Sequence, residues 1–375
     1  MNERGADRPE TERVARLRRE LDERDVDVLL VESLLDVRYL TGFTGTAGVA
    51  LVAGEAYRRA LGPLRFLTDF RYATQSSEQL PDGFEREIVA GELLEGIARA
   101  LSSAGGRLGF DEAHLTVKGL GRLEALLGER WELVPSAGVI AGLRAVKEPG
   151  EIARIRAAAE LADEAMRELL EAGVVGRTER EVAIELELRM RRLGAQAPSF
   201  PSIVAAGANG ALPHAEPHEQ QIPPDVLVTI DWGALLDGYC SDCTRTYATG
   251  EGISEQARDV YELVLAAQRR GLAAVKAGPS GREVDAVARQ VIDQGGHREH
   301  FGHGLGHGVG MDVHEAPRLS QTAGDAPLRA GQVVTVEPGV YLPGCLGVRI
   351  EDLVVVREDV QEVLTSLPKE LTVIS

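Results

Sequence analysis

The stretch HGLGHGVGMDVHE (residues 303–315) combines side chains that could do chemistry with residues that take up little space. It carries His303, His307 and His314 among four glycines. Imidazole is a common metal ligand and a general acid or base near neutral pH, and glycine lets the backbone approach a ligand closely. No placement of G-x-G-x-x-G fits residues 302–310, which argues against a phosphate loop of the dinucleotide-binding kind. The histidines therefore indicate a metal or acid–base site.

Two segments predict β-hairpins that carry carboxylates on facing strands. In VLVTIDWGALLDGYCSDCTRTY, a turn centred between residues 236 and 237 would place Asp231 directly opposite Asp242. In VVTVEPGVYLPGCLGVRIEDLVVV, Glu337 and Glu351 lie at equal distances from a Pro-Gly turn and would also face each other. Like charges that face each other across a ladder cost stability. The four carboxylates therefore need a positive partner.

Metal ions would supply that charge. Asp231 and Glu337 each follow an apolar run typical of a strand buried on both faces, where an unpaired carboxylate is costly or becomes protonated. Four carboxylates exceed the usual set around one zinc ion, whereas hard oxygen ligands with one imidazole suit two Mn²⁺-like ions roughly 3.5–4 Å apart. One of the histidines is the expected fifth ligand. Taken singly, each acid could instead lie on a solvated strand face.

The size and charge of the chain limit the class of protein. Its 375 residues exceed the size at which single cores usually stop growing, so we expect two domains. The formal net charge of −18 and the lack of a long basic run argue against a nucleic-acid partner. The charged first residues are unlike a secretory signal, and no apolar run approaches the roughly 20 residues that span a bilayer. We therefore expect a cytoplasmic protein with no membrane partner.

The three cysteines are too few for a disulfide framework, which fits a reducing compartment. Cys240 and Cys243 form a C-x-x-C that could be a redox pair or half of a zinc site, but the sequence has no second C-x-x-C and the pair does not precede a helix. Two small apolar side chains in a strand are the simpler interpretation.

The pattern of secondary structure changes near residue 145. Over residues 1–145, apolar runs typical of strands alternate with amphipathic helices, which indicates an α/β domain. Over residues 146–375 we expect two long helices, the first hairpin, two more helices and closing strands, which is an α+β arrangement. Those helices are expected at about 149–172, 178–194, 253–275 and 281–295.

The motifs resemble those of the pita-bread metallopeptidases, specifically the Xaa-Pro branch that contains prolidase and aminopeptidase P, over essentially the whole chain. The resemblance implies a creatinase-like N-terminal domain, a pita-bread catalytic domain and two divalent ions, with Mn²⁺ preferred over Co²⁺ or Zn²⁺. It also implies that DWG supplies a ligand of one ion, that SDCTRT and RIED supply bridging carboxylates, and that GHGVG and EPG supply ligands of the second ion. In chain order these five ligands are Asp231, Asp242, His307, Glu337 and Glu351.

The same resemblance gives roles to the remaining residues. We expect catalytic roles for Glu337, His314 and His303 and substrate contacts from His214 and Arg349. Glu337 would be the general base and later the proton donor to the departing proline nitrogen. His314 would donate a hydrogen bond to the developing oxyanion, and His214 and His303 would form the wall of a proline pocket.

The predicted activity is hydrolysis of an Xaa-Pro bond at a free peptide N-terminus, with prolidase, a dipeptidase, slightly favoured over aminopeptidase P. A basic group of the N-terminal domain could select dipeptides by pairing with their carboxylate, and Arg38 in DVRYL is the candidate. Arg58, Arg59 and Arg65, in a segment that looks longer than usual, are more ordinarily solvated or dimer-contact residues. We expect a homodimer formed partly through the N-terminal domains.

Three alternatives share the expected architecture in part. A creatinase-like enzyme cleaves a C–N bond without metals, and the five intact ligands count against it. Methionine aminopeptidase shares the metal site but usually lacks an N-terminal domain of this kind. Non-catalytic pita-bread modules that only bind peptides have lost ligand residues. A metal content of about two ions per chain would favour the peptidase.

Overall fold

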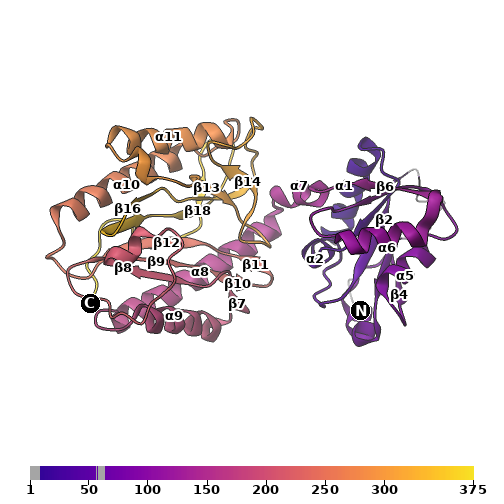
Figure 1. The fold of residues 1–375 in the computed structure, drawn as a ribbon, viewed down its shortest axis with the longest axis horizontal. Helices are drawn as coiled ribbons and strands as arrows, with labels where there is room; N and C mark the ends of the chain where they lie inside the picture. Colours follow the sequence, from indigo (N-terminus) through magenta and orange to yellow (C-terminus); the bar gives the residue numbers. More distant parts are fainter. Residues whose placement is uncertain (1–8, 56, 58–63) are drawn as a thin grey trace, which may run out of the picture. The chain divides into compact units, whose positions relative to one another are not determined.

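A computed structural model describes residues 9–55, 57 and 64–375. The chain divides into two compact units, Met1–Arg144 (unit 1) and Ala145–Ser375 (unit 2), and many elements of each are labelled in Figure 1. Arg58 and Arg59, which were considered as surface or dimer-contact residues, lie outside the described residues.

Unit 1 is built on one six-stranded mixed sheet in the order β4-β3-β2-β1-β5-β6. The pairs β1–β2 and β2–β3 are antiparallel, and the pairs β3–β4, β1–β5 and β5–β6 are parallel. All four residues of β1 are buried, as expected for a central strand that is covered on both faces. The strands are β1 (Val28–Val31), β2 (Val49–Ala53), β3 (Leu64–Thr68), β4 (Phe84–Ile88), β5 (Gly106–Phe110) and β6 (Trp131–Pro135).

The helices of unit 1 alternate with these strands, as the apolar pattern predicts. They are α1 (Pro9–Glu23), α2 (Leu34–Thr41), α4 (Ala73–Gln79), α5 (Leu93–Ala100), α6 (Val117–Leu127) and α7 (Val139–Ala145), which reaches the boundary with unit 2. The sequence pattern does not predict the short helices α2, α4 and α7. In α2 the start is fixed by Ser33, whose hydroxyl accepts a hydrogen bond from the Asp36 amide.

Unit 2 contains four long helices, and each begins and ends within two residues of its predicted position. They are α8 (Pro149–Ala172), α9 (Glu179–Leu193), α10 (Glu255–Ala274) and α11 (Gly281–Gln294). Capping boxes start α8, α9 and α11, each with a glutamate at the third helical position that returns to the cap backbone. In the described part of the chain, no helix is both long enough and apolar enough to cross a membrane.

The two helix pairs of unit 2 lie on opposite sides of its strands (Figure 1). Helices α8 and α9 share a core with the sheet β12-β9-β8, in which Met166 and Leu186 pack near Ile230. Helices α10 and α11 share a second core with strands of the C-terminal half, in which Val264 and Val354 are fully buried. The strands of the first half are β7 (Ala197–Pro198), β8 (Ile203–Ala206), β9 (Leu227–Trp232), β10 (Ala234–Leu236), β11 (Tyr239–Cys240) and β12 (Cys243–Ala248). The strands of the second half are β13 (Gly306–Gly308), β14 (Glu315–Leu319), β15 (Val333–Val336), β16 (Gly339–Leu342), β17 (Leu346–Arg349), β18 (Asp352–Val355) and β19 (Glu362–Val363).

The first hairpin forms, but its predicted register is wrong. The ladder pairs Asp231 with Thr244, and not with Asp242. The physical reason is the turn, which is centred on Asp237 and Gly238, both with positive φ (49° and 78°). An Asp-Gly pair favours this type I′ geometry. The shift moves each partner by two residues, so Asp242 stays on the same face of the hairpin as Asp231.

The second hairpin has the predicted register. Gly339 pairs with Arg349 near the turn, and Val336 pairs with Asp352 on the far side. Both ladders therefore place Glu337 opposite Glu351. Gly344 has a φ of 70°, the left-handed conformation that a glycine adopts without strain in a turn.

Cys240 and Cys243 are buried in β11 and β12. Their thiols contact the carbonyl oxygens of Met311 and Glu351 respectively, at 3.8 Å in both cases. This placement matches the interpretation of two small side chains packed within strands.

Candidate active site

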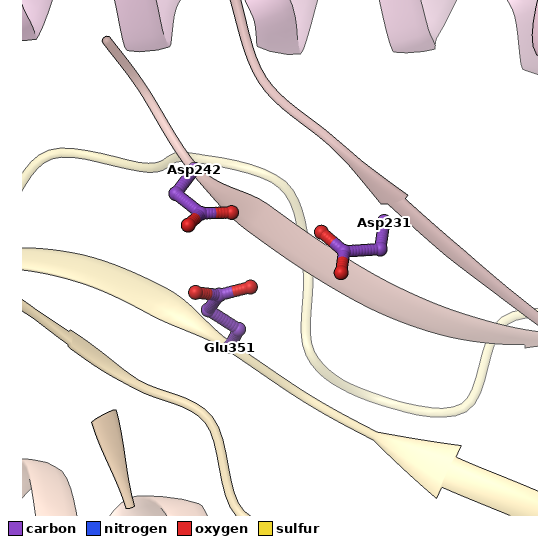
Figure 2. Close-up of side chains that lie close together, drawn as sticks. All are labelled: Asp231, Asp242 and Glu351. Atoms are coloured by element: carbon purple, nitrogen blue, oxygen red, sulfur yellow. The ribbon is translucent and has the colours of Figure 1, made fainter. Parts of the chain in front are cut away.

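Three carboxylates from separate segments of unit 2 converge at one point (Figure 2). Asp231 lies in β9, Asp242 lies between β11 and β12, and Glu351 lies between β17 and β18. One ligand atom from each lies within 4.8 Å of the others. Burial together with the repulsion of Glu351 and Asp231 raises the pKa of Asp242 well above its ordinary value. Burial together with the charges of Glu337 and Asp231 does the same to the pKa of Glu351.

His307 and Glu337 stand beside this group. The Nε2 atom of His307 lies 3.3 Å from Oε1 of Glu337 and 3.6 Å from Oδ2 of Asp242. The Nδ1 atom of His307 lies 3.1 Å from the carbonyl oxygen of Gly308, and because a carbonyl only accepts, Nδ1 carries the proton of that bond. The Nε2 atom is thus directed at the carboxylates, which is how a second partner orients an imidazole ligand.

The mutual interaction of Glu337 and His307 favours the charged form of each, whereas the pKa values of the other acids are raised. Burial raises the pKa of Glu337, but the hydrogen bond and charge of His307 outweigh burial and lower it to about 2. Burial lowers the pKa of His307, but Glu337 outweighs burial and the pKa lies above its usual range. Glu337 is therefore an ionised carboxylate at neutral pH.

The donor set fits a pair of hard divalent ions. The Oδ1 atom of Asp231 is buried and has no hydrogen-bond partner within the described part of the chain, a costly arrangement for a carboxylate oxygen unless a cation is present. Burial raises the pKa of Asp231 even though Arg349 opposes that shift. Carboxylate oxygens with one oriented imidazole are ligands that Mn²⁺-class ions accept. The structure thus brings together all five predicted ligand residues, while their roles as ligands stay a prediction.

Arg349 is buried among these acids and is held by protein groups. Its side chain is 5% exposed, and its Nη2 lies 2.7 Å from Oδ2 of Asp231. It also donates hydrogen bonds to the Thr244 hydroxyl, the Tyr341 hydroxyl and the Pro213 carbonyl oxygen, at 2.9–3.1 Å. These four bonds favour a role in holding the cavity wall over the expected direct contact with substrate.

His303 is held at both ring nitrogens. Its Nδ1 lies 2.8 Å from the carbonyl oxygen of Gly304, so Nδ1 donates that bond. Its Nε2 lies 2.9 Å from the Tyr341 hydroxyl, and burial lowers the pKa of His303, so the neutral ring accepts a hydrogen bond there. Because both nitrogens are engaged, the geometry favours the expected place of His303 in the pocket wall, and its expected catalytic role stays a prediction.

The remaining predicted residues of unit 2 line the same cavity, whose volume is about 610 Å³. His314 is exposed, and its ring centroid lies 4.3 Å from that of His307. Burial and the neighbouring His307 lower the pKa of His314, so at neutral pH it has one N–H to donate. His214 is also exposed and lies on the wall.

Arg38 belongs to unit 1, where it is half-buried in α2. The residues that line the cavity come from unit 2. The predicted role of Arg38 in recognising a dipeptide carboxylate therefore stays a prediction.

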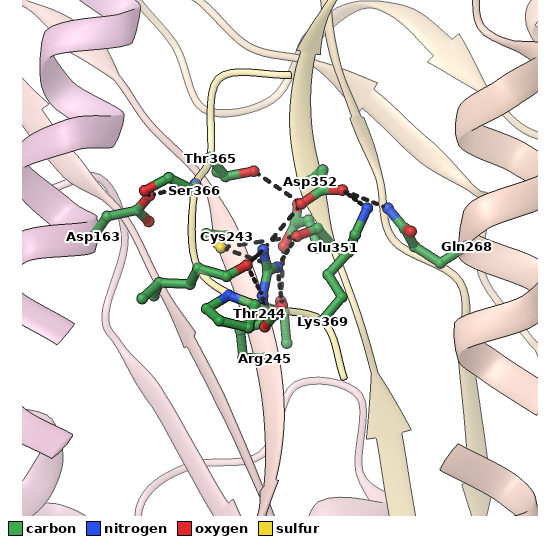
Figure 3. Close-up of polar contacts among 12 residues, drawn as sticks. Asp163, Cys243, Thr244, Arg245, Gln268, Glu351, Asp352, Thr365, Ser366 and Lys369 are labelled. Atoms are coloured by element: carbon green, nitrogen blue, oxygen red, sulfur yellow. Dashed lines mark hydrogen bonds and ion pairs between the residues drawn. The ribbon is translucent and has the colours of Figure 1, made fainter. Parts of the chain in front are cut away.

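Behind the carboxylates, Arg245 in β12 contacts the segment of Glu351 and Asp352 and residues near the C-terminus (Figure 3). Its side chain is 1% exposed and lies 3.0 Å from Oδ1 of Asp352. It donates hydrogen bonds to the carbonyl oxygens of Thr244, Glu351 and Leu367. The backbone that carries Glu351 is thus fixed by contacts to residues more than 100 positions away in sequence.

The sequence interpretation missed Tyr341 and Arg318, which line the cavity, and Thr244, which contacts one of its carboxylates. Thr244 donates a hydrogen bond to Oε2 of Glu351 at 2.7 Å, and Tyr341 joins Arg349 to His303. Arg318 lines the cavity from β14. Strand alternation could have identified Tyr341, which lies on the same face as Glu337 four residues earlier, and the Asp-Gly turn could have placed Thr244.

Comparisons with known proteins identify the family of the chain. Residues 153–358 match the model of metallopeptidase family M24, and residues 13–146 match the creatinase/prolidase N-terminal domain. An uncharacterized peptidase of Bacillus subtilis is 41% identical over 363 residues, which cover 96% of this chain and 100% of that protein.

Two solved structures are similar over nearly their whole length. An Xaa-Pro dipeptidase from Bacillus anthracis is 40% identical, with 97% of this chain and 99% of that chain covered and a TM-score of 0.91. An X-Pro aminopeptidase from Thermotoga maritima is 34% identical, with 95% and 99% covered and a TM-score of 0.85. The expected α/β creatinase-like domain followed by an α+β pita-bread catalytic domain is confirmed. The chain belongs to metallopeptidase family M24, among the members that carry a creatinase/prolidase N-terminal domain.

Proposed function

We propose that this protein hydrolyses the Xaa-Pro bond at a free peptide N-terminus with two divalent ions, Mn²⁺ in the first instance. The observation that carries the proposal is the convergence of five ligand-type side chains at one cavity that also holds three further histidines. Names of both Xaa-Pro enzymes occur among the similar structures. The ligand set would be Asp231, Asp242, His307, Glu337 and Glu351.

Ions bound there would polarise the scissile carbonyl and lower the pKa of an attacking water. Glu337 is ionised and receives a hydrogen bond from Thr335 at 3.1 Å. It is the candidate to accept the proton of that water and to return it to the proline nitrogen. The neutral ring of His314 has one N–H. This N–H would donate a hydrogen bond to the carbonyl oxygen as charge develops on it.

Recognition of proline must rest on the ring, because its nitrogen carries no hydrogen for a peptidase to bind. His214, His303 and Phe200 line the cavity and offer flat or apolar surfaces to a pyrrolidine ring. The ring of His303 is fixed at both nitrogens, so it can form a rigid wall.

The choice between dipeptides and longer peptides depends on a positive group beyond the scissile bond. In a dipeptide the C-terminal carboxylate lies one residue past the scissile bond. A cation at that distance would pair with this carboxylate and so would favour the binding of dipeptides over that of longer peptides. Arg318 is a candidate within the cavity, since it is exposed and pairs with His307 in the β13–β14 ladder. Arg38 is the candidate from unit 1. On this basis we favour prolidase over aminopeptidase P.

The test compares kcat/KM for Ala-Pro with that for Ala-Pro-Ala, in enzyme that has been stripped with a chelator and reloaded with Mn²⁺, Co²⁺ or Zn²⁺. We expect about two ions per chain and a higher kcat/KM for the dipeptide. Preference for the tripeptide would instead make aminopeptidase P the correct activity. Full activity in excess chelator, with no metal in the protein, would overturn the metallopeptidase mechanism.

We also propose a cytoplasmic homodimer that forms partly through the N-terminal units. The cysteine content supports a reducing compartment, since three cysteines in 375 residues are too few for a disulfide framework. Sedimentation equilibrium of the full chain and of a variant with Arg65→Glu tests the dimer, and a monomeric wild type would overturn it.

A further inference from the structure

A buried carboxylate at the start of α9 holds one wall of the cavity. Glu179 is the first residue of this helix and is 2% exposed. Its Oε1 accepts a hydrogen bond from the Ala206 amide at 2.7 Å. Its Oε2 accepts hydrogen bonds from the side-chain amide of Asn209 and from the backbone amide of His218, each at 2.8 Å. Both oxygens of one carboxylate are therefore used on the segment 206–218.

This segment forms a side of the candidate active site. Strand β17 fixes its middle, because Arg349 donates a hydrogen bond to the Pro213 carbonyl oxygen at 3.1 Å. Gly210 also approaches Gly347 so closely that a Cβ on Gly347 would lie 1.8 Å from the Gly210 oxygen. The residues of the segment that line the cavity are Pro213, His214, Ala215 and Glu216.

The three bonds to Glu179 bracket the lining residues along the chain. Ala206 and Asn209 precede His214, and His218 follows it. Asn209 adds a cross-link within the segment, since its side-chain amide also lies 3.3 Å from the Glu216 carbonyl oxygen. The backbone on both sides of His214 is thus tied to one buried side chain.

We infer that Glu179 is a positioning residue for substrate: it fixes segment 206–218 so that His214 faces the proline ring. The inference rests on the proposed function for the identity of the substrate. Glu179 does not touch the carboxylate cluster, so its loss acts on substrate binding and leaves the metal ligands in place. A general role in stability would instead lower binding, turnover and metal content together.

The test is Glu179→Gln, assayed with Ala-Pro in Mn²⁺-loaded enzyme. A glutamine keeps the shape but turns one acceptor into a donor, so at least one of the three N–H groups loses its partner. We expect KM to rise about tenfold, which corresponds to about 1.4 kcal/mol, with kcat and the number of bound ions little changed.

The matched control is Glu181→Gln, two residues along the same helix. Glu181 is exposed and its side chain accepts the Thr178 amide in the capping box of α9. Glutamine also serves in a capping box, so this variant removes the same charge at the same helix start without altering segment 206–218. We expect its KM to match that of wild type.

A second pair of variants separates a local contact from a loss of charge. Asn209→Asp alone places two carboxylates at the 2.8 Å contact and should raise KM as well. Combining it with Glu179→Gln reverses donor and acceptor across that contact, and we expect KM to fall back part of the way. Rescue of this kind cannot arise from a general loss of stability.

Hydrogen exchange gives a readout that does not depend on activity. In Glu179→Gln the amides of Ala206 and His218 should exchange faster, while amides in the middle of α9 stay protected. Unchanged exchange at both amides, an unchanged KM, or parallel loss of kcat, ions and thermal stability would each overturn the inference. If wild type fails to cleave Ala-Pro while the exchange result holds, the proposed substrate fails and the fixing of the segment stands.

Discussion

The buried pair between Arg349 and Asp231 allows a quantitative test of how the cavity holds its charges. The two side chains are 5% and 13% exposed, and their Nη2 and Oδ2 atoms lie 2.7 Å apart. Methionine in place of Arg349 fills a similar volume but carries no charge and no donor. Removing one partner of a buried pair costs about 3–5 kcal/mol, because the other charge stays buried without compensation. The hydrogen bonds to Thr244 and Tyr341 are lost in the same change and do not add independently.

We therefore expect Arg349→Met to lose about 3–5 kcal/mol of unfolding free energy in the presence of a chelator. Urea denaturation, followed on the transition of the catalytic unit, measures the loss. Added Mn²⁺ should recover part of it, because ions that bind only the folded state stabilise that state. The control is Arg357→Met: Arg357 pairs with Glu362 where the side chains are 43% and 35% exposed, so its loss should stay within about 1 kcal/mol.

Two results would refute this reasoning at different points. An Arg349→Met protein that unfolds no earlier than Arg357→Met would show that the buried pair does not stabilise the fold. If Arg349→Met loses stability but Mn²⁺ restores none of it, the conclusion that the pair stabilises the fold would stand. That result would, however, argue against Asp231 as a metal ligand.

Four further predictions concern single side chains. Asp242→Ala should abolish binding of the second ion in a calorimetric titration, while Glu337→Gln should keep part of the metal and lose most of kcat, roughly 10²–10⁴-fold. His314→Ala should lower kcat by about 10²–10³-fold with little change in metal content; released metal with turnover spared at saturating metal would mean that His307 and His314 have been assigned the wrong way round. Burial raises the pKa of Asp352, but the charges of Arg245 and a neighbouring lysine outweigh burial and lower it below 3.8. The contribution of Asp352 to stability is therefore fully present above pH 3.8 and is lost as the pH falls through its lower pKa in the folded state. The free energy of unfolding of Asp352→Asn should therefore fall less steeply on the acid side than that of wild type. An unchanged acid side would contradict this prediction.

The two hairpins show how far local pattern determines this site. The Pro-Gly turn gives the register that pairs Val336 with Asp352, so the facing of Glu337 and Glu351 follows from sequence. In the other hairpin the Asp-Gly turn sets the register. A prediction that centres the turn elsewhere pairs Asp231 with Asp242, two residues away from its actual partner Thr244. Because side chains alternate with a period of two, this error leaves the residues on the correct face. Convergence of the carboxylates could therefore be predicted without the correct partner.

Contacts between distant segments could not be predicted in the same way. The guanidinium of Arg245 meets the Leu367 carbonyl oxygen across 122 positions, and Glu179 meets His218 across 39. The periodicity of the sequence does not predict which carbonyl or amide group a buried side chain will contact, because the contact depends on how helices and strands pack together in the folded unit. The two hydrogen bonds of His303 depend on such packing, and they favour its expected place in the pocket wall, while its expected catalytic role stays a prediction.

The sequence predicts that the four carboxylates need a positive partner, and Arg349 of the chain itself supplies part of that positive charge. The guanidinium of Arg349, which pairs with Asp231, supplies one full positive charge to the cluster of carboxylates Asp231, Asp242, Glu337 and Glu351. Arg318 and Glu216 also line the cavity and carry opposite charges. If His307 is a metal ligand as proposed, its ring must be neutral, and three negative charges then stay uncompensated. One divalent ion still leaves the site negative, whereas two leave it with one positive charge, which favours a hydroxide or another anion beside them. Arg349 thus sets the balance: without it, two ions would only neutralise the carboxylates, and the attraction for an anionic nucleophile would be lost.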